Sequence, residues 1–491
     1  MPQPIHPLGG YDTPMSTGNE RIRGTSIPLG LFQGVGIIVL NSPYRELVPS
    51  DGPKIPFDIS PARSGIHTVT NPSKPITLVA NLSAQFMNAA LYYTDDEQSR
   101  KLLAHNELAQ TASVLAFTLP EDTLVIPLHD EGQKLATQVV KESWQRLGIE
   151  TSNNIEYVAP EAIDYSGSAT PFIISPESLL QKGANLKDAF TSVAAYTKDG
   201  PVLSWVADGV PTPTTFFLSG GEALDGGLAR VVDELKDWDE VVMNSTNGSG
   251  GFGIYFLERE QLLQQSTLEL FHDLHNLTLQ IQPKLDLTHS PCIIATISAD
   301  GAFTVQHMSE QRFATPGAHG GNIWYEGIEK DVVPPGSESV VLAAIQSMAD
   351  RGVRGQINLD FLTLDQEYAQ QHNVAPFLVR EVNVRPAGSS SQIRMRDILI
   401  NEMPVKRIHT KTGITIPKSQ LENGEVFQII DQLQHVYKNE KILIYSAKVT
   451  EKDEYATIHV GFLSNENNEE AVNELESTFL SILNGPTDTM N

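Results

Sequence analysis

Cysteine and long apolar runs are nearly absent from this chain. Cys292 is the only cysteine among 491 residues, which excludes an internal disulfide framework and a cysteine metal cluster. We expect Cys292 to lie in the core of a strand. The longest apolar run, around residues 29–40, is interrupted and too short to span a bilayer, and the first residues lack the apolar region of a secretory signal. These features predict a soluble, cytoplasmic protein.

Basic residues are also scarce. The chain has 34 Lys and Arg against 60 Asp and Glu, which gives a formal net charge of −26. Because an acidic surface repels polyanions, neither nucleic acid nor an anionic membrane is an expected partner. The length is sufficient for about three domains, each with its own core.

A dense group of glycines lies between two short apolar runs in residues 241–257, VVMNSTNGSGGFGIYFL. Its spacing matches GxGxxG, but the dinucleotide fingerprint requires a helix directly after the loop. Residues 254–257 are instead β-branched and aromatic, which favours a β-hairpin whose loop closes over the phosphates of a nucleotide. A flexible glycine hairpin without a ligand is the alternative. The predicted phosphate-binding residues are Gly248, Ser249, Gly250, Gly251, Phe252 and Gly253.

Two later stretches, GQINLDF at 355–361 and FLVREVNVR at 377–385, each resemble a strand that ends in polar groups. Strand alternation places Glu381, Asn383 and Arg385 on one face. Together with Asp360, the carboxylate and amide oxygens are hard ligands suited to Mg²⁺, with Mn²⁺ as an alternative ion. Arg385 can bind a phosphoryl or acyl oxygen. A solvated charged strand is the other interpretation.

Taken together, the glycine hairpin and the two polar strands resemble the ATP-grasp superfamily of carboxylate–amine ligases. The order of elements is most similar to the pheganomycin-type peptide ligases. The resemblance implies binding of ATP and Mg²⁺, with Asp360, Glu381 and Asn383 as the metal ligands. It also implies an acyl-phosphate intermediate, from which an amine forms an amide (peptide) bond while ADP and phosphate are released. One departure is that Met243 and Asn244 stand where the superfamily usually has a phosphate-binding lysine.

Three other functions are weighed against this one. Related butirosin-type enzymes load an amino acid onto a carrier protein, and Asn244 also allows a non-catalytic ATP-binding homologue. A protein kinase shares a glycine-rich hairpin, but no HRD or DFG stretch follows it here. The expected partners are small-molecule or peptide-like carboxylate and amine substrates, and both a homodimer and a carrier protein are left open.

The predicted fold class is α/β and α+β. The expected parts are an N-terminal extension (1–29), a pre-ATP-grasp α/β domain (30–165), an ATP-grasp core with the nucleotide between two α+β subdomains (166–403), and a small C-terminal α+β domain (404–491). Expected strands include 36–40, 76–81, 122–127, 155–159, 442–449 and 455–462. Expected helices include 99–116, 131–147, 185–197, 227–238, 258–275, 337–351, 420–437 and 469–483.

Three further residues are candidates for ATP binding. The resemblance places an adenine hinge where the strand LTLQIQP stops at residue 283, with Gln282 and Lys284 nearby. Lys187, in the helix expected over 185–197, is a candidate phosphate contact by its charge. An ordinary exposed helix lysine is the alternative for Lys187.

Overall fold

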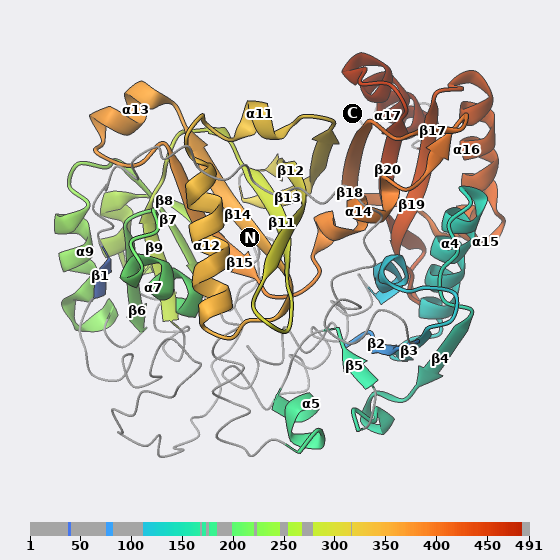
Figure 1. Cartoon of the computed structure of the whole chain (residues 1–491), viewed down its shortest axis with the longest axis horizontal. Helices are drawn as coiled ribbons and strands as arrows, with labels where there is room; N and C mark the ends of the chain where they lie inside the picture. The colour runs from blue at the N-terminus through green and yellow to red at the C-terminus, as the bar shows by residue number, and fades with distance from the viewer. Residues whose placement is uncertain are drawn as a thin grey trace.

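The computed structural model describes residues 38–40, 75–81, 111–166, 169–172, 176–183, 199–219, 223–245, 254–267, 278–315 and 317–483. These residues form three larger β-sheets with helices packed on them. In Figure 1 the five-stranded sheet lies on the left, the nine-stranded sheet runs from the centre to the right, and the four-stranded sheet lies at the lower right. Several predictions fall outside the described residues: the extension 1–29, most of the helix at 99–116, the helix at 185–197 with Lys187, and the glycine loop at 246–253.

Four parallel strands form the first sheet, in the order β4-β3-β2-β5. Their bounds are β2 (Thr77–Val79), β3 (Thr123–Pro127), β4 (Asn154–Val158) and β5 (Ala169–Pro171). Helix α4 (Gly132–Arg146) joins β3 to β4, as the sequence predicts, and it buries Ala136, Val140 and Trp144 at helical spacing. The end of the helix expected over 99–116 is instead the 3-10 helix η2 (Thr111–Phe117). It stops where the Thr118 hydroxyl donates to the Leu115 carbonyl.

The second sheet has five antiparallel strands in the order β1-β6-β9-β7-β8. Their bounds are β1 (Ile38–Leu40), β6 (Thr215–Ser219), β7 (Glu240–Ser245), β8 (Ile254–Glu258) and β9 (Thr278–Pro283). The hairpin predicted on either side of the glycine loop is confirmed as β7–β8. Strand β1 was assigned by sequence to the parallel lobe but pairs with β6, because a short apolar strand does not specify its partner.

Helix α9 (Leu228–Glu234) lies next to this second sheet, and Leu228 and Val231 share a hydrophobic core with Met243 of β7. After β8 the sequence predicts a helix over 258–275. In the described part of that range, the structure has the 3-10 helix η5 (Arg259–Leu263), which begins with a capping box between Glu258 and Gln261, and α-helical residues at 265–267. The rest of the predicted helix, 268–275, lies outside the described residues.

The third sheet has nine strands and forms the centre of the molecule. Its order is β10-β14-β11-β12-β13-β18-β20-β19, and β15 pairs with the free edge of β14. The bounds are β10 (Leu287–His289), β11 (Pro291–Ile297), β12 (Phe303–Thr315), β13 (Ala318–Tyr325), β14 (Gly355–Leu364), β15 (Phe377–Asn383), β18 (Arg407–Pro417), β19 (Glu440–Lys448) and β20 (Tyr455–Ser464). Strand β11, PCIIATI, is buried along its whole length, which explains its continuous apolar sequence. Strands β11 and β12 form an antiparallel hairpin, with Gly301 in its turn at φ +91°.

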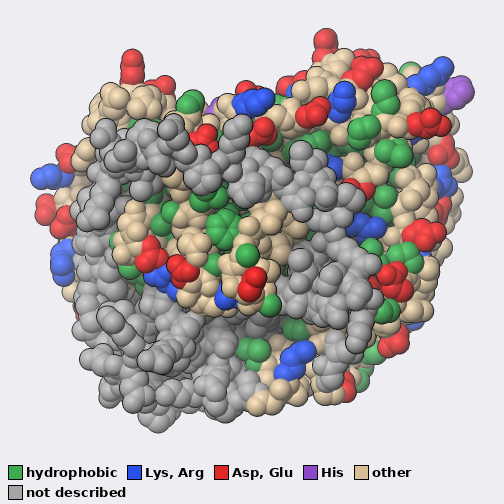
Figure 2. All heavy atoms as spheres, viewed as in Figure 1, with side chains coloured by type: hydrophobic (Ala, Val, Ile, Leu, Met, Phe, Trp, Pro, Cys, Tyr) green, Lys and Arg blue, Asp and Glu red, His purple; other side chains and the backbone are tan. Residues whose placement is uncertain are grey.

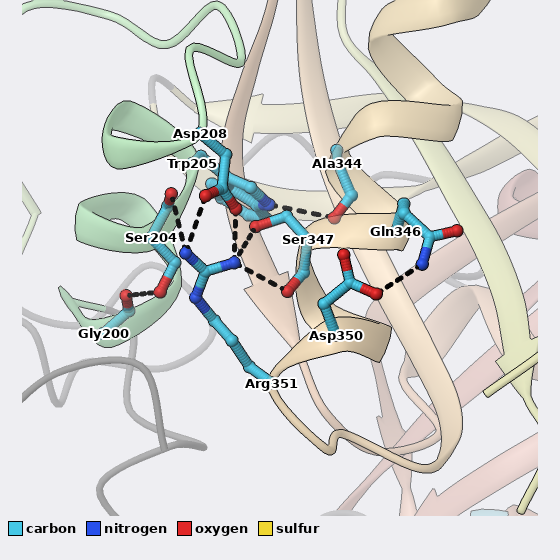
Figure 3. A network of polar contacts seen from close by, with 9 residues as sticks. All are labelled: Gly200, Ser204, Trp205, Asp208, Ala344, Gln346, Ser347, Asp350 and Arg351. Atoms are coloured by element: carbon cyan, nitrogen blue, oxygen red, sulfur yellow. Dashed lines mark hydrogen bonds and ion pairs between the residues drawn. The ribbon is translucent and has the colours of Figure 1, made fainter. Parts of the chain in front are cut away.

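Helix α7 (Asp199–Ala207) is fixed against α12 (Glu338–Asp350), as Figure 3 shows. The indole nitrogen of Trp205 donates to the Ala344 carbonyl over 3.0 Å. At the end of α12, the Arg351 guanidinium binds both oxygens of Asp208 and the Ser347 carbonyl. Because α7 precedes β6 in the chain, these contacts connect the five-stranded sheet to α12, the helix that packs on the nine-stranded sheet.

The C-terminal strands belong to the same sheet as the core, because β13 pairs with β18 across the predicted boundary at 403/404. The same C-terminal part of the chain contains three helices, α15 (Lys418–Glu422), α16 (Glu425–Val436) and α17 (Glu469–Leu483). The helix predicted over 420–437 is interrupted at Gly424, whose φ of +69° ends one helix and begins the next. Helix α4 packs on β19, where the Ser143 hydroxyl accepts a hydrogen bond from the Ile444 amide over 2.8 Å. The domain limits themselves stay predictions.

The remaining elements are short. They are η3 (Pro160–Ala162), α5 (Pro176–Gln181), η4 (Ala223–Gly227), α11 (Glu329–Val332), α13 (Gln366–Gln371), η6 (Gly388–Ser390), α14 (Ser391–Met395), β16 (Leu399–Ile400) and β17 (Met403–Pro404). No helix in the described ranges is both long and apolar enough to cross a membrane. On the face shown in Figure 2, acidic and basic side chains are interspersed over the described surface.

Candidate functional site

Strands β14 and β15 bring the predicted metal ligands together. Their antiparallel register places Asp360 opposite Glu381, and Asn358 opposite Asn383. Since side chains two positions apart on a strand share a face, these four side chains lie on one face of the sheet. The Asn383 amide nitrogen lies 3.4 Å from the Glu381 carboxylate. The predicted grouping is therefore present, and the role of these residues as metal ligands stays a prediction.

The same face continues onto β11 and β12 with polar side chains that the sequence did not single out. The Gln311 amide nitrogen donates to the Asp360 carboxylate over 2.6 Å. Cys292, opposite Asp360 on β11, is buried in a strand core and donates to the Asn358 amide oxygen over 2.7 Å. Ser389 Oγ lies 3.1 Å from the Cys292 sulfur. These contacts fix the orientation of the Asp360 and Asn358 side chains.

Cys292 is not a nucleophile in this setting. Burial raises the pKa of its thiol well above the ordinary value, and the negative charge of Asp360 raises it further. The sulfur therefore stays protonated and acts as a hydrogen-bond donor within the sheet.

Arg385 follows β15 directly and reaches into the space in front of the two carboxylates. Desolvation lowers the pKa of its guanidinium to about 10, although the charges of Glu381 and Asp360 oppose this shift. Arg385 is thus still a cation at neutral pH. One of its terminal nitrogens donates to the Pro386 carbonyl over 3.1 Å, which orients the side chain.

A single cavity of about 210 Å³ joins these groups to the glycine hairpin. Asp360, Glu381, Asn383 and Arg385 line it from the central sheet, and Ile254 lines it from the five-stranded sheet. Ile254 is the first residue of β8, immediately after the glycine loop. Strand β8, which follows the predicted phosphate loop in the sequence, therefore begins at the same cavity as the predicted metal strands.

The turn between β12 and β13 also approaches β8 at this cavity. Gly317, at φ +77°, lies so close that an added Cβ would stand 2.9 Å from the Phe256 ring. A glycine is required there both by the backbone conformation and by the contact. The two sheets thus meet at the cavity through β8 and this turn.

The cavity is also lined by uncharged side chains, among them Phe117, Phe172, His319, Ser446 and His459. The two phenylalanine rings lie 5.5 Å apart. Burial lowers the pKa of His459 to about 4 and also lowers that of His319, so both imidazoles are neutral at pH 7.

Two of these lining residues, Ser446 and His459, lie at an irregularity in the pairing of β19 with β20. The register shifts between Ile444 and Ser446, and Ser446 comes to lie opposite His459. Such bulges redirect side chains and are frequent beside active sites. An irregularity of this kind leaves no pattern that can be read from a single sequence.

The other predicted ATP contacts lie elsewhere among the described residues. Gln282 is buried on β9 and donates to the Thr215 hydroxyl over 2.9 Å. Lys284 forms an ion pair with Glu240 at 2.5 Å, near the end of β7. Neither residue lines the cavity, so their roles in ATP binding stay predictions.

Asn244, at the position of the expected lysine, lies on β7 opposite Gln280. It is buried, and its amide oxygen has no hydrogen-bond partner in the structure as described. Lys187, Gly248, Ser249, Gly250, Gly251, Phe252 and Gly253 lie outside the described residues.

The donor set in front of β14 and β15 fits a hard divalent ion. It consists of two carboxylates and an amide oxygen, which are ligand types that Mg²⁺ and Mn²⁺ accept. Within the described ranges no group of three His, Cys, Asp or Glu residues could hold a metal. A site here would therefore depend on the Asn383 oxygen and on oxygens of a bound phosphate, as is usual for Mg²⁺.

No protein-family model matches this chain, and no curated protein matches it in sequence. Among solved structures, N5-carboxyaminoimidazole synthetase from Staphylococcus aureus, solved with ADP, matches with a TM-score of 0.50 at 12% identity. That match covers 83% of this chain and 97% of the other. The chain has the ATP-grasp fold. The predicted fold class is therefore confirmed, while an identity this low leaves the chemistry to be argued from the site.

Two weaker matches have TM-scores below 0.5. The N5-carboxyaminoimidazole synthase from Aspergillus clavatus, with ADP and 5-aminoimidazole ribonucleotide, has a TM-score of 0.49 at 10% identity over 84% of this chain and 99% of that one. D-alanyl-alanine synthetase A from Vibrio cholerae has a TM-score of 0.37 at 11% identity over 55% and 89%.

Proposed function

We propose that this chain is an ATP- and Mg²⁺-dependent carboxylate–amine ligase. The observation that supports it most is the convergence on one cavity of Ile254, which follows the glycine loop, with Asp360, Glu381 and Arg385. The hairpin and the polar strands are far apart in sequence, so their meeting at one cavity is a property of the fold. An ATP-grasp fold whose cavity holds two carboxylates and a buried cation is suited to phosphoryl transfer.

In the proposed reaction, an oxygen of the substrate carboxylate attacks the γ-phosphorus of ATP, and the bond to ADP breaks. The amine nitrogen then attacks the acyl carbon of the acyl phosphate, phosphate leaves with the bonding electrons, and the nitrogen loses a proton. Bound Mg²⁺ would neutralise charge on the phosphates. Arg385 would stabilise the oxygens of the transferred group by its fixed charge, because the cavity desolvates it and strengthens the interaction.

The uncharged lining residues of the cavity support a proposal about the substrate. Phe117, Phe172 and the two neutral imidazoles suit an uncharged, partly apolar group better than a phosphate or a second carboxylate. This is compatible with an amino acid or peptide-like substrate, as the pheganomycin-type resemblance implies. We therefore place amide bond formation on such a substrate first. Loading of a carrier protein stays the alternative.

The test is product analysis of the purified protein with Mg-ATP and a panel of amino acids and short peptides. We expect ADP, phosphate and an amide in equal amounts, and a hydroxamate when hydroxylamine replaces the amine. Glu381→Gln serves as the inactive control. Binding of Mg-ATP without release of ADP across the whole panel would favour the non-catalytic homologue, and ADP release without a hydroxamate or amide would exclude the acyl-phosphate route.

A further inference from the structure

Strand β15 contains an irregularity beside the predicted metal ligands. Glu381 lies opposite Asp360, but the next pair is Val379 with Phe361, so Arg380 has no partner on β14. Two residues of β15 therefore face one residue of β14, which is the definition of a β-bulge.

The bulge changes the direction of the Arg380 side chain. In a regular strand, Val379 and Val382 would point to opposite faces. Here both are buried in the same hydrophobic core, so the two residues between them, Arg380 and Glu381, lie outside it. Arg380 accordingly lines the cavity together with Glu381 and Arg385.

Arg380 differs from the paired arginines of the molecule. Arg351 is held by Asp208, and Arg312 by Glu476. For Arg380, no hydrogen bond or ion pair is found within the described part of the chain, although it is only partly exposed. A guanidinium with five N–H donors on a cavity wall, unengaged by the protein, is suited to an anionic ligand.

Binding of a phosphate in the cavity would also require a cationic side chain. Asn244 offers a neutral amide where the resemblance places a phosphate-binding lysine, and Lys284 is engaged by Glu240 outside the cavity. Among the described residues that line the cavity, the cationic side chains are Arg380 and Arg385. They stand on either side of Glu381 in the chain, Arg380 within β15 and Arg385 shortly after it.

We propose that Arg380 binds phosphoryl oxygens of ATP and supplies the charge that Asn244 does not. The bulge in β15 places the guanidinium beside the predicted metal site, where it can make two parallel hydrogen bonds to a phosphate. This inference rests on the proposed function, since it presumes that the cavity receives ATP. The same guanidinium could instead bind the substrate carboxylate, and the experiment separates these two anions.

The experiment compares Arg380→Gln and Arg380→Lys with Arg230→Gln, an exposed arginine on α9 that serves as the matched control. Affinities for Mg-ATP, Mg-ADP and adenosine are measured by calorimetry on the full-length protein, and folding is checked by thermal unfolding. We expect Arg380→Gln to weaken ATP binding by roughly 10- to 100-fold, as for a lost charged hydrogen bond. Adenosine binding should be unchanged, and Arg380→Lys should recover part of the loss.

The alternative outcomes are distinct. Unchanged ATP affinity with a raised KM for the carboxylate would assign Arg380 to the substrate and overturn the inference. An equal loss for ATP and adenosine, with a lower melting temperature, would show a structural role and overturn it as well. If the wild type bound no ATP, the proposed function would fail with the inference; wild-type binding with an unaffected Arg380→Gln variant would remove the inference alone.

Discussion

Replacing Glu381 by glutamine tests whether the facing carboxylates of Asp360 and Glu381 bind a cation or stabilise the fold. Directly opposed side chains on antiparallel strands have Cβ atoms about 5 Å apart, so Asp360 and Glu381 repel each other when both are ionised. Coulomb's law gives about 3 kcal/mol of repulsion at an effective dielectric constant of 20, and about 0.8 kcal/mol in water. Arg385 offsets part of this cost. A like-charge pair at this place is therefore unfavourable for the fold without a bound cation.

The assay is thermal unfolding of the wild type and Glu381→Gln, with and without Mg²⁺ and ATP, alongside ADP release. Without ligands, we expect the variant to be as stable as the wild type or up to about 1 kcal/mol more stable, because the repulsion is removed. With ligands, only the wild type should gain stability, by about 2.7 kcal/mol at a hundredfold excess over Kd, and only the wild type should turn over.

A matched control is Glu326→Gln, at an exposed position outside the cavity. This substitution should change neither the stability nor the turnover. The reasoning would be refuted if Glu381→Gln lost about 2 kcal/mol of stability without ligands and kept wild-type turnover. In that case Glu381 would support the fold and the metal assignment would be wrong.

Three other outcomes are expected. Burial opposes ionisation of Glu476, but hydrogen bonds from Arg312 outweigh this effect and hold the pKa of Glu476 below its usual value. The Glu476→Gln variant should therefore lose about 1–3 kcal/mol of unfolding free energy at pH 7. Denaturant titrations should show that the difference in stability between wild type and variant shrinks as the pH falls below 4.5. Gly321→Ala should lose at least about 3 kcal/mol in the same titrations, because φ is +140° and the added Cβ would lie 1.9 Å from the Thr410 carbonyl oxygen. Gly251→Val should weaken binding of ATP in calorimetry while the protein still unfolds cooperatively, and unchanged affinity would contradict the phosphate-loop prediction.

The polar strands could be recognised from the sequence because the pattern that marks them lies within a few consecutive residues. Glu381 and Asn383 are two residues apart in a strand that is apolar apart from them and Arg380, so alternation alone places them on one face. The same reasoning could have found Asn358, two positions before Asp360 on β14. It predicted the β7–β8 hairpin for a similar reason, since the glycines mark a turn between two β-branched runs.

What the sequence could not supply depends on pairing between distant segments. Gln311 reaches Asp360 only because β12 lies two strands from β14 in the central sheet, and register of this kind is set by tertiary packing. His319 and His459, far apart in the chain, meet at the cavity for the same reason. Strand β1 was placed in the wrong sheet because three apolar residues fit either edge.

The bulge at Arg380 shows a different limit. Regular alternation would assign Arg380 and Glu381 to opposite faces, and one extra residue in the register reverses that assignment for Arg380. A side chain that the sequence pattern would leave away from the site instead lines its cavity. The position of the Arg380 charge was therefore inaccessible from the pattern, although the strand itself was predicted.

Those charges decide whether so acidic a protein can hold a nucleotide. A net charge of −26 opposes the approach of ATP, but at physiological salt charges more than about 8 Å apart are largely screened. Binding therefore depends on the groups within the cavity, where desolvation strengthens each interaction. Among the described residues that line it, Arg380 and Arg385 balance Asp360 and Glu381 in formal charge, so these side chains provide no surplus of positive charge for a triphosphate. A divalent ion held by the two carboxylates supplies that surplus, which is why we expect ATP affinity to depend steeply on Mg²⁺ and measurable binding to be lost when EDTA removes it.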